Sequence, residues 1–212
     1  MSGLKISKAS LARLPIYLDC LKSLPHSAGE YTSAAQIASA LKLGEIQVRK
    51  DLAAVSQGGK PRIGYKTESL INDIESYLGY NKTINAVLVG AGKLGKALLE
   101  YSRFSEYGLD IVAAFDISED NLGSANNGKI IYHLDNFSEI CKNCNAQIGI
   151  ITVPCASAQD VCSLMVESGI KAIWNFASSH LDVPEDVWVQ NENMAASVAL
   201  LSGHLTNNQK IL

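Results

Sequence analysis

The chain has 212 residues, of which 47% are hydrophobic and 18% are charged, and its formal net charge is −3. This composition excludes a disordered or fibrous protein, and the length suffices for one large or two small domains. No apolar run approaches the roughly 20 residues of a membrane-spanning helix and no secretory signal opens the chain, so we expect a cytoplasmic protein with no membrane partner.

The charge is distributed unevenly along the chain. Residues 1–83 carry 11 Lys and Arg against 7 Asp and Glu, a net of +4, and the remaining residues carry 7 against 14, a net of −7. A basic front on an acidic body indicates an anionic partner for the N-terminal part only.

The first elements along the chain are short helices. Leucines spaced three and four residues apart predict a helix over residues 10–24, with Pro15 in its first turn or at a small break. Thr32 or Ser33 can cap a second helix, whose buried face is expected to contain Ile37, Ala38 and Leu41.

The turn that follows indicates a DNA-binding motif. Residues 42–44 form a short turn in which Gly44 can take a left-handed conformation, and Glu45 begins a helix that runs to about Val55. The apolar side chains available to pack inward on this helix are Ile46, Val48, Leu52 and Val55. Two short helices joined by a glycine-containing turn are typical of a helix-turn-helix.

A β-hairpin is predicted directly after this pair of helices. Gly58 and Gly59 supply its turn, and Ile63 and Tyr65 alternate in its strand. The hairpin makes the N-terminal region a winged helix, and a further helix over residues 68–80 links it to the rest of the chain.

The second helix of the pair would lie in the major groove, and the wing would contact phosphates or the minor groove. Arginine can donate two hydrogen bonds to guanine, glutamine can pair with adenine, and lysine suits a phosphate or guanine. Asp51 is better suited to orient a neighbouring cation than to touch DNA. The alternative is that residues 47–52 are merely a solvated helix face. The candidate DNA-binding residues are Gln47, Arg49, Lys50, Lys60 and Arg62.

From residue 83 onward, apolar runs alternate with helical segments, which predicts an α/β fold with a doubly wound parallel sheet of the Rossmann type. A final helix is predicted over about 190–208, with Met194, Val198, Leu200, Leu201 and Leu205 on its apolar side. The expected strands are 84–90, 110–116, 129–134, 146–154 and 171–177, and the expected helices between them are 93–104, 136–144 and 157–169.

Gly90, Gly92 and Gly95 form a G-x-G-x-x-G motif between a predicted strand and a predicted helix. The first glycine allows a tight turn, the second lets the backbone approach a pyrophosphate, and the third lets the helix pack closely on the strand. Asp116, 21 residues beyond Gly95, ends the next strand, where an acid binds ribose hydroxyls and favours NAD(H) over NADP(H). The alternatives are a turn without a ligand, or another adenine ligand of the CoA type.

A sensor is favoured over an enzyme. A dehydrogenase needs a proton donor or acceptor and normally a substrate domain, and the nucleotide-binding domain leaves no residues for one. His180 is the best-placed histidine, although a solvated loop residue is the alternative. Cys141 and Cys144 form a CxxC, for which we favour structural thiols over a redox role; a zinc site lacks two further ligands, so no metal is expected.

Taken together, these motifs resemble the Rex family of redox-sensing transcriptional repressors over about residues 7–205. The segments that carry the resemblance include "QVRKDL", "VGAGKLGKALLEY", "IITVPCASAQDV" and "VPEDVWVQNEN". The resemblance implies a homodimer that binds an inverted-repeat operator and releases it when NADH binds. It divides the chain into a DNA-binding domain (1–82), a Rossmann NAD(H)-binding domain (83–190) and a dimerisation helix (191–212) that is swapped between subunits.

The resemblance also implies roles for single residues. Thr152, Val153 and Pro154 would line the nicotinamide side, with Asn175, Phe176 and Ala177 near the same pocket, and Arg13 and Tyr101 would couple the nucleotide to the DNA-binding domain. The chain departs from the family at Ala195 and Ala196, where relatives have an acid that engages the tyrosine and a bulky residue; Glu192 is an alternative acid. The residues expected around the pyrophosphate and adenosine ribose are Gly90, Ala91, Gly92, Lys93, Leu94, Gly95, Asp116 and Ile117.

Overall fold

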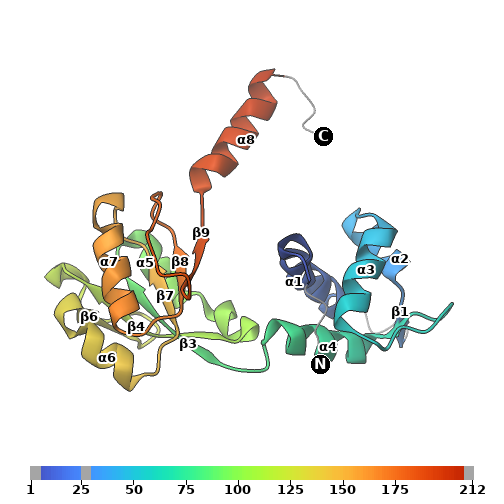
Figure 1. Ribbon diagram of the computed structural model, residues 1–212, viewed down its shortest axis with the longest axis horizontal. Helices are drawn as coiled ribbons and strands as arrows, with labels where there is room; N and C mark the ends of the chain where they lie inside the picture. The colour runs from blue at the N-terminus through green and yellow to red at the C-terminus, as the bar shows by residue number, and fades with distance from the viewer. Residues whose placement is uncertain (1–5, 25–29, 208–212) are drawn as a thin grey trace. The chain divides into compact units, whose positions relative to one another are not determined.

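The structure is a computed structural model that describes residues 6–24 and 30–207. The chain divides into two compact units, Met1–Lys82 and Thr83–Leu212 (Figure 1). The ends of the predicted segments 1–82 and 191–212 extend beyond the described residues.

The first helix, α1 (Lys8–Lys22), buries Leu14, Leu18 and Leu21 as its leucine spacing predicts. The prediction for Pro15 is wrong, because it lies in the interior of an unbroken helix. A proline there removes the hydrogen bond to the carbonyl of residue 11. Leu11 itself is 42% exposed.

The helix-turn-helix consists of α2 (Ala34–Leu41) and α3 (Glu45–Val55). Ser33 caps α2 in a capping box with Gln36. The left-handed residue of the turn is Lys42, with a φ of 53°, whereas Gly44 has a φ of −70° and is the N-cap of α3. The prediction of a left-handed Gly44 is therefore wrong, because α2 ends two residues earlier than a glycine cap would require.

Helix α3 buries one face, and this face contains only some of the residues that the sequence predicts. Val48 and Leu52 are fully buried and Asp51 is only 5% exposed. Ile46 was expected to pack inward but is 70% exposed. With 3.6 residues per turn, residue 46 lies on the opposite side of the helix from residue 48.

The wing is shorter than predicted. β1 (Tyr31–Thr32) pairs antiparallel with β2 (Tyr65–Lys66), and an isolated bridge joins Lys60 to Gly64. The predicted turn at residues 58–59 is wrong, because the chain reverses between Lys60 and Gly64, whose backbones exchange hydrogen bonds of 2.8 and 2.9 Å. Helix α4 (Thr67–Leu78) follows and completes the buried core of this unit.

Within residues 83–207, the second unit contains a seven-stranded sheet in the order β5-β6-β4-β3-β7-β8-β9. Neighbouring strands are parallel except for β5, which is antiparallel to β6. The doubly wound sheet is therefore confirmed, with β5 and β9 as additions that the sequence did not predict. The strands are β3 (Ile84–Val89), β4 (Leu109–Asp116), β5 (Gly123–Ser124), β6 (Ile130–His133), β7 (Ile148–Ile151), β8 (Ala172–Asn175) and β9 (Trp188–Asn191).

Helices cover both faces of this sheet. Val87 and Val89 of β3 point into a core shared with α6 and α7, and Ala86 and Leu88 point into a second core shared with α5. Because β3 pairs with both β4 and β7, the strand order reverses beside it, where ligands bind in folds of this class. The helices are α5 (Lys93–Glu100), α6 (Phe137–Asn143) and α7 (Cys155–Glu167), with 3-10 turns η2 (Ser102–Tyr107), η3 (Glu119–Asn121) and η4 (Leu134–Asn136).

The last described element is α8 (Met194–Asn207), which follows β9 (Figure 1). Its large apolar side chains are all more than half exposed, in contrast to those of the other helices. No helix among the described residues is long and apolar enough to cross a membrane. The exposed apolar side chains of α8 are Met194, Val198, Leu200, Leu201 and Leu205.

Candidate functional site

The glycine motif forms a tight turn between β3 and α5. Gly90 has a φ of 103°, and a Cβ on it would lie 2.8 Å from the backbone carbon of Thr152 at the end of β7. The Thr152 hydroxyl donates to the carbonyl of Gly90 at 2.8 Å and holds the turn against the neighbouring strand. The first glycine is therefore required both by its backbone conformation and by the closeness of β7.

The other two glycines differ in their surroundings. A Cβ on Gly95 would collide with the carbonyl oxygen of Gly90, whereas a Cβ on Gly92 would meet nothing within 4 Å. Gly92 is the N-cap of α5 and provides no side-chain cap, so the first backbone N–H groups of α5 have no capping partner there. The turn thus offers an open approach to a helix N-terminus, which suits an anionic group.

Asp116 ends β4 and fixes the glycine loop from the other side. Its Oδ2 accepts a hydrogen bond from the backbone N–H of Ala91 at 2.6 Å, and its Oδ1 accepts one from Ser118 at 2.8 Å. The carboxylate is only partly buried, so its remaining lone pairs can accept from a ligand.

A pocket of about 630 Å³ brings most of these residues together. Five of its lining residues were not predicted: Val89 at the end of β3, and four residues of η4 and α7 that carry no local motif, namely Leu134, Ser157, Asp160 and Val161. The predicted residues that line it are Gly90, Gly92, Asp116, Ile117, Thr152, Val153 and Pro154. Since Thr152, Val153 and Pro154 share the pocket with Asp116, they lie beside the position expected for the adenosine ribose.

The remaining predicted nucleotide contacts lie outside this pocket. The Asn175 amide donates to the Ser179 carbonyl and to Asn191, and its oxygen accepts from the N–H of Ala177, so it shapes the loop after β8. Phe176 packs against the Trp174 ring. Ala91 and Gly95 are buried beneath the glycine turn, and Lys93 and Leu94 are exposed on the first turn of α5.

Tyr101 lies at the end of a row of aromatic rings. Its ring is 4.9 Å from Phe104, which in turn is 5.6 Å from Trp174. Trp174 Nε1 donates to Glu192 at 2.9 Å. Glu192 therefore bonds to Trp174, and the Phe104 ring lies between Trp174 and Tyr101. Ala195 is exposed on α8.

The cysteines and His180 are arranged as structural or solvated residues. Cys141 is buried, which raises the pKa of its thiol to about 11, and Cys144 donates to the Cys141 carbonyl. The His180 side chain is 89% exposed. Among residues 6–24 and 30–207, no cluster of three or more His, Cys, Asp or Glu could hold a metal ion.

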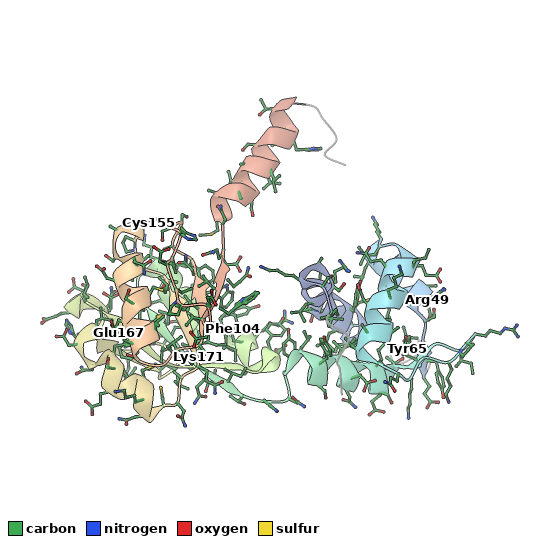
Figure 2. All side chains as sticks on the ribbon, viewed as in Figure 1. Arg49, Tyr65, Phe104, Cys155, Glu167 and Lys171 are labelled. Atoms are coloured by element: carbon green, nitrogen blue, oxygen red, sulfur yellow. The ribbon has the colours of Figure 1, made fainter. Side chains whose placement is uncertain are left out.

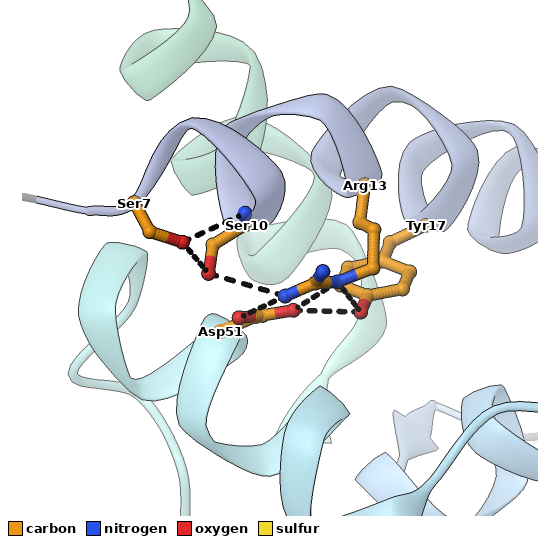
Figure 3. A network of polar contacts seen from close by, with 5 residues as sticks. All are labelled: Ser7, Ser10, Arg13, Tyr17 and Asp51. Carbon is orange, nitrogen blue, oxygen red and sulfur yellow. Dashed lines mark hydrogen bonds and ion pairs between the residues drawn. The ribbon is translucent and has the colours of Figure 1, made fainter.

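In the first unit, a polar network ties α3 to α1 (Figure 3). Arg13 donates to both oxygens of Asp51, at 2.8 and 3.0 Å, and the Tyr17 hydroxyl donates to Asp51 at 2.8 Å. Burial opposes ionisation of Asp51, but the hydrogen bonds from Arg13 and Tyr17 outweigh it and hold its pKa below the ordinary value. Asp51 therefore orients a cation, as expected, and Arg13 is that cation.

Three of the predicted DNA contacts line one groove. Arg49 of α3, labelled in Figure 2, lines it together with Lys60 and Arg62 of the wing, and the groove has a volume of about 520 Å³. The Arg49 guanidinium forms an ion pair with Glu45, one turn earlier on the helix. Tyr65 forms part of the groove wall.

The other two predicted contacts lie in a second concave surface, between α1 and α3. Gln47 and Lys50 line it together with Ile46 and Arg13, and its volume is about 510 Å³. With its amide oxygen turned toward α1, Gln47 accepts from Arg13 Nη1 at 2.9 Å. The Arg13–Asp51 pair therefore also positions a candidate base-reading side chain.

Two family models match the chain. One describes a CoA binding domain and matches residues 81–179; the other, described as "Putative DNA-binding protein N-terminus", matches residues 5–53. The redox-sensing transcriptional repressor Rex of Bacteroides thetaiotaomicron is 39% identical over 205 residues, covering 97% of this chain and 93% of that protein. The same-named protein of Treponema denticola is 41% identical over 201 residues, covering 95% of each.

Solved structures agree with these relatives. A crystal structure of RSP in complex with β-NAD⁺ and operator DNA has a TM-score of 0.90 and 30% identity, covering 97% of this chain and 94% of that chain. A structure of RSP with β-NADH has a TM-score of 0.85 and 29% identity, covering 97% and 96%.

Proposed function

The chain belongs to the Rex family of redox-sensing transcriptional repressors, and from this premise we propose which residues bind the nucleotide and which bind DNA. It is a DNA-binding repressor that senses NADH and NAD⁺. The observation that carries the assignment is that the glycine-loop pocket and the basic helix-turn-helix belong to separate compact units. Such a repressor needs no chemistry on its ligand, and it acts in the cytoplasm, where bacterial DNA lies.

The pocket suits one half of a dinucleotide. The pyrophosphate would lie over Gly92 at the N-terminus of α5, and Asp116 would accept from the adenosine ribose hydroxyls. The apolar side chains beside Asp116 form a slot for adenine, chiefly Ile117, Val153 and Val161. A CoA-type ligand shares the adenine nucleotide and remains the alternative occupant.

Asp116 is expected to select NADH over NADPH, because its charge repels a 2′-phosphate. We expect Asp116→Asn to keep the bond to Ala91 but to bring NADPH affinity within about threefold of NADH affinity. Asp116→Ala should lower NADH affinity by at least about tenfold. Titrations followed by cofactor fluorescence measure both variants, and unchanged selectivity in Asp116→Asn would remove this residue from the ribose site.

For the DNA site, we propose that Arg49 reads a base in the major groove and that Lys60 and Arg62 contact the backbone. Gln47 and Lys50 would approach the same major groove of the DNA from the α1 side of α3. These residues lie on two concave surfaces that flank α3, which supports α3 as the element that enters the groove.

Glu45 is expected to restrain Arg49, because their ion pair must open before Arg49 reaches a base. Arg49→Ala should weaken specific binding by about 1–3 kcal/mol. Glu45→Gln should instead raise operator affinity by about threefold. The salt dependence of operator binding should change less in Glu45→Gln than in Arg49→Ala, which loses a cation. Fluorescence anisotropy over a salt series tests both, and weaker binding by Glu45→Gln would mean that Glu45 itself contacts a cytosine.

We propose that α8 forms a homodimer contact, as its exposed apolar face lacks a partner within the described chain. Met194, Val198, Leu201 and Leu205 recur on one face. Leu201→Glu should therefore shift the chain toward monomer in sedimentation velocity, while Ala199→Glu, on another face, should not. Equal behaviour of the two variants would contradict a dimer built on this face.

The sensing function itself is tested by operator binding in the presence of NADH, NAD⁺ and NADPH. Release by NADH at concentrations at which NAD⁺ leaves the complex intact is the expected result. This comparison is decisive for this chain, because Ala195 and Ala196 stand where the family's switch residues are expected. Equal responses to all three would leave a DNA-binding protein without redox control, and turnover of hydroxy or keto acids would instead indicate an oxidoreductase.

A further inference from the structure

The surface of α3 contains one feature that the proposed contacts do not use. Ile46 is 70% exposed, although Val48 and Leu52 of the same helix are fully buried and Val55 is partly buried. Ile46 is not part of the buried core of this unit, so packing of that core does not explain why an isoleucine stands at this position.

The neighbours of Ile46 define the kind of partner that this side chain faces. Residues three and four positions apart are adjacent on a helix surface, so Ile46 lies beside Arg49 and Lys50. It also lines the concave surface that contains Gln47 and Arg13. An apolar group surrounded by cations and an amide fits a partner that is mainly anionic and presents a small apolar group among polar ones.

The DNA major groove has this chemistry. Its edges present hydrogen-bonding groups on every base, and the 5-methyl group of thymine is the apolar group that they offer. A helix that docks with its first turn toward the bases brings residue 46 to the groove floor. Asp51, held by Arg13 and Tyr17, fixes the rotation of α3 that points Ile46 outward.

We propose that Ile46 is a specificity-determining residue that contacts a thymine 5-methyl group in each operator half-site. This inference rests on the proposed function of α3 as the DNA-reading helix. It predicts that the preferred operator contains a thymine next to the positions read by Arg49 and Lys50.

The test uses the full chain and a palindromic duplex that the chain itself selects from a random DNA library. Each thymine of the half-site is replaced in turn by uracil, which removes only the 5-methyl group. For the wild-type chain, at least one replacement should weaken binding by about fourfold per half-site, which corresponds to one buried methyl group. Ile46→Ala should bind the thymine duplex more weakly and show no difference between thymine and uracil at that position.

Two controls separate this effect from general damage. Ile16→Ala removes an isoleucine that is 49% exposed on α1 and should retain the uracil effect in full. Ile46→Val keeps a branched apolar side chain and should retain part of the effect. Thermal unfolding of Ile46→Ala should match the wild type, because an exposed residue is replaced by a good helix former.

The outcomes are distinct. A wild-type chain that binds its selected duplex but tolerates uracil everywhere overturns the methyl contact, and so does an Ile46→Ala chain with an undiminished uracil effect. Equal loss of affinity on thymine and uracil duplexes would assign Ile46 to a protein contact instead. A chain that selects no duplex would overturn the DNA-binding assignment of α3 and this inference with it.

Discussion

Asp51→Ala is expected to abolish specific operator binding while leaving nucleotide binding intact. Asp51 joins Arg13 and Tyr17 of α1 to α3, and Arg13 in turn holds Gln47. Removing a nearly buried carboxylate leaves Arg13 without its partner, which should lower the unfolding free energy of this unit by about 2–4 kcal/mol. Operator affinity should fall by about 100-fold or more, toward the nonspecific level.

Chemical denaturation and operator binding measure the two effects, and NADH titration provides the internal control. Tyr17→Phe is the milder comparison, because it removes only the hydroxyl, which donates to Asp51 and accepts from Arg13, and should lower stability by about 1–2 kcal/mol. Normal operator affinity in Asp51→Ala would mean that α3 keeps its orientation without this network.

The same network predicts a pH dependence. The pKa of Asp51 is lower in the folded chain than in the unfolded chain, so ionised Asp51 stabilises the fold above the unfolded value of about 4. This contribution should be lost as the pH falls through the lower folded value. Asp51→Asn should therefore lose less stability than the wild type when both are acidified.

Gly95→Ala is expected to have the largest effect on nucleotide binding. Its Cβ would collide with the Gly90 carbonyl oxygen, so the loop between β3 and α5 must move. We expect a loss of about 1–3 kcal/mol of stability and about 100-fold weaker NADH binding, because the backbone donors no longer converge on one anion. Thermal unfolding and fluorescence titration give the two quantities.

Gly92→Ala is the matched comparison. A Cβ at Gly92 meets no protein atom within 4 Å and its φ of −68° is ordinary, so stability should stay within about 0.5 kcal/mol of the wild type. NADH affinity should nevertheless fall by about tenfold, because the methyl group occupies space meant for the pyrophosphate. Unchanged affinity would show that the ligand does not approach the loop at Gly92.

Local signals in the sequence were enough for the main elements. Helix α3 begins and ends where its periodicity predicts, and the long buried strands β3 and β4 were found from their apolar runs. The glycine motif and Asp116 predict a nucleotide site because their chemistry depends on positions close to a strand end. By contrast, β5 and β9 are short, largely exposed strands, so no apolar pattern marks them.

The sequence by itself therefore indicated the family and the two kinds of binding site and predicted candidate residues for each, because these follow from local periodicity and from motifs with fixed spacing. Only the tertiary structure decided that Ile46 faces outward and that Asp51 binds Arg13, which is 38 residues away. It also brought Asp160 and Val161 of α7 to the pocket beside Asp116. Such contacts depend on how helices rotate and pack against distant segments, and no single stretch of sequence encodes that rotation.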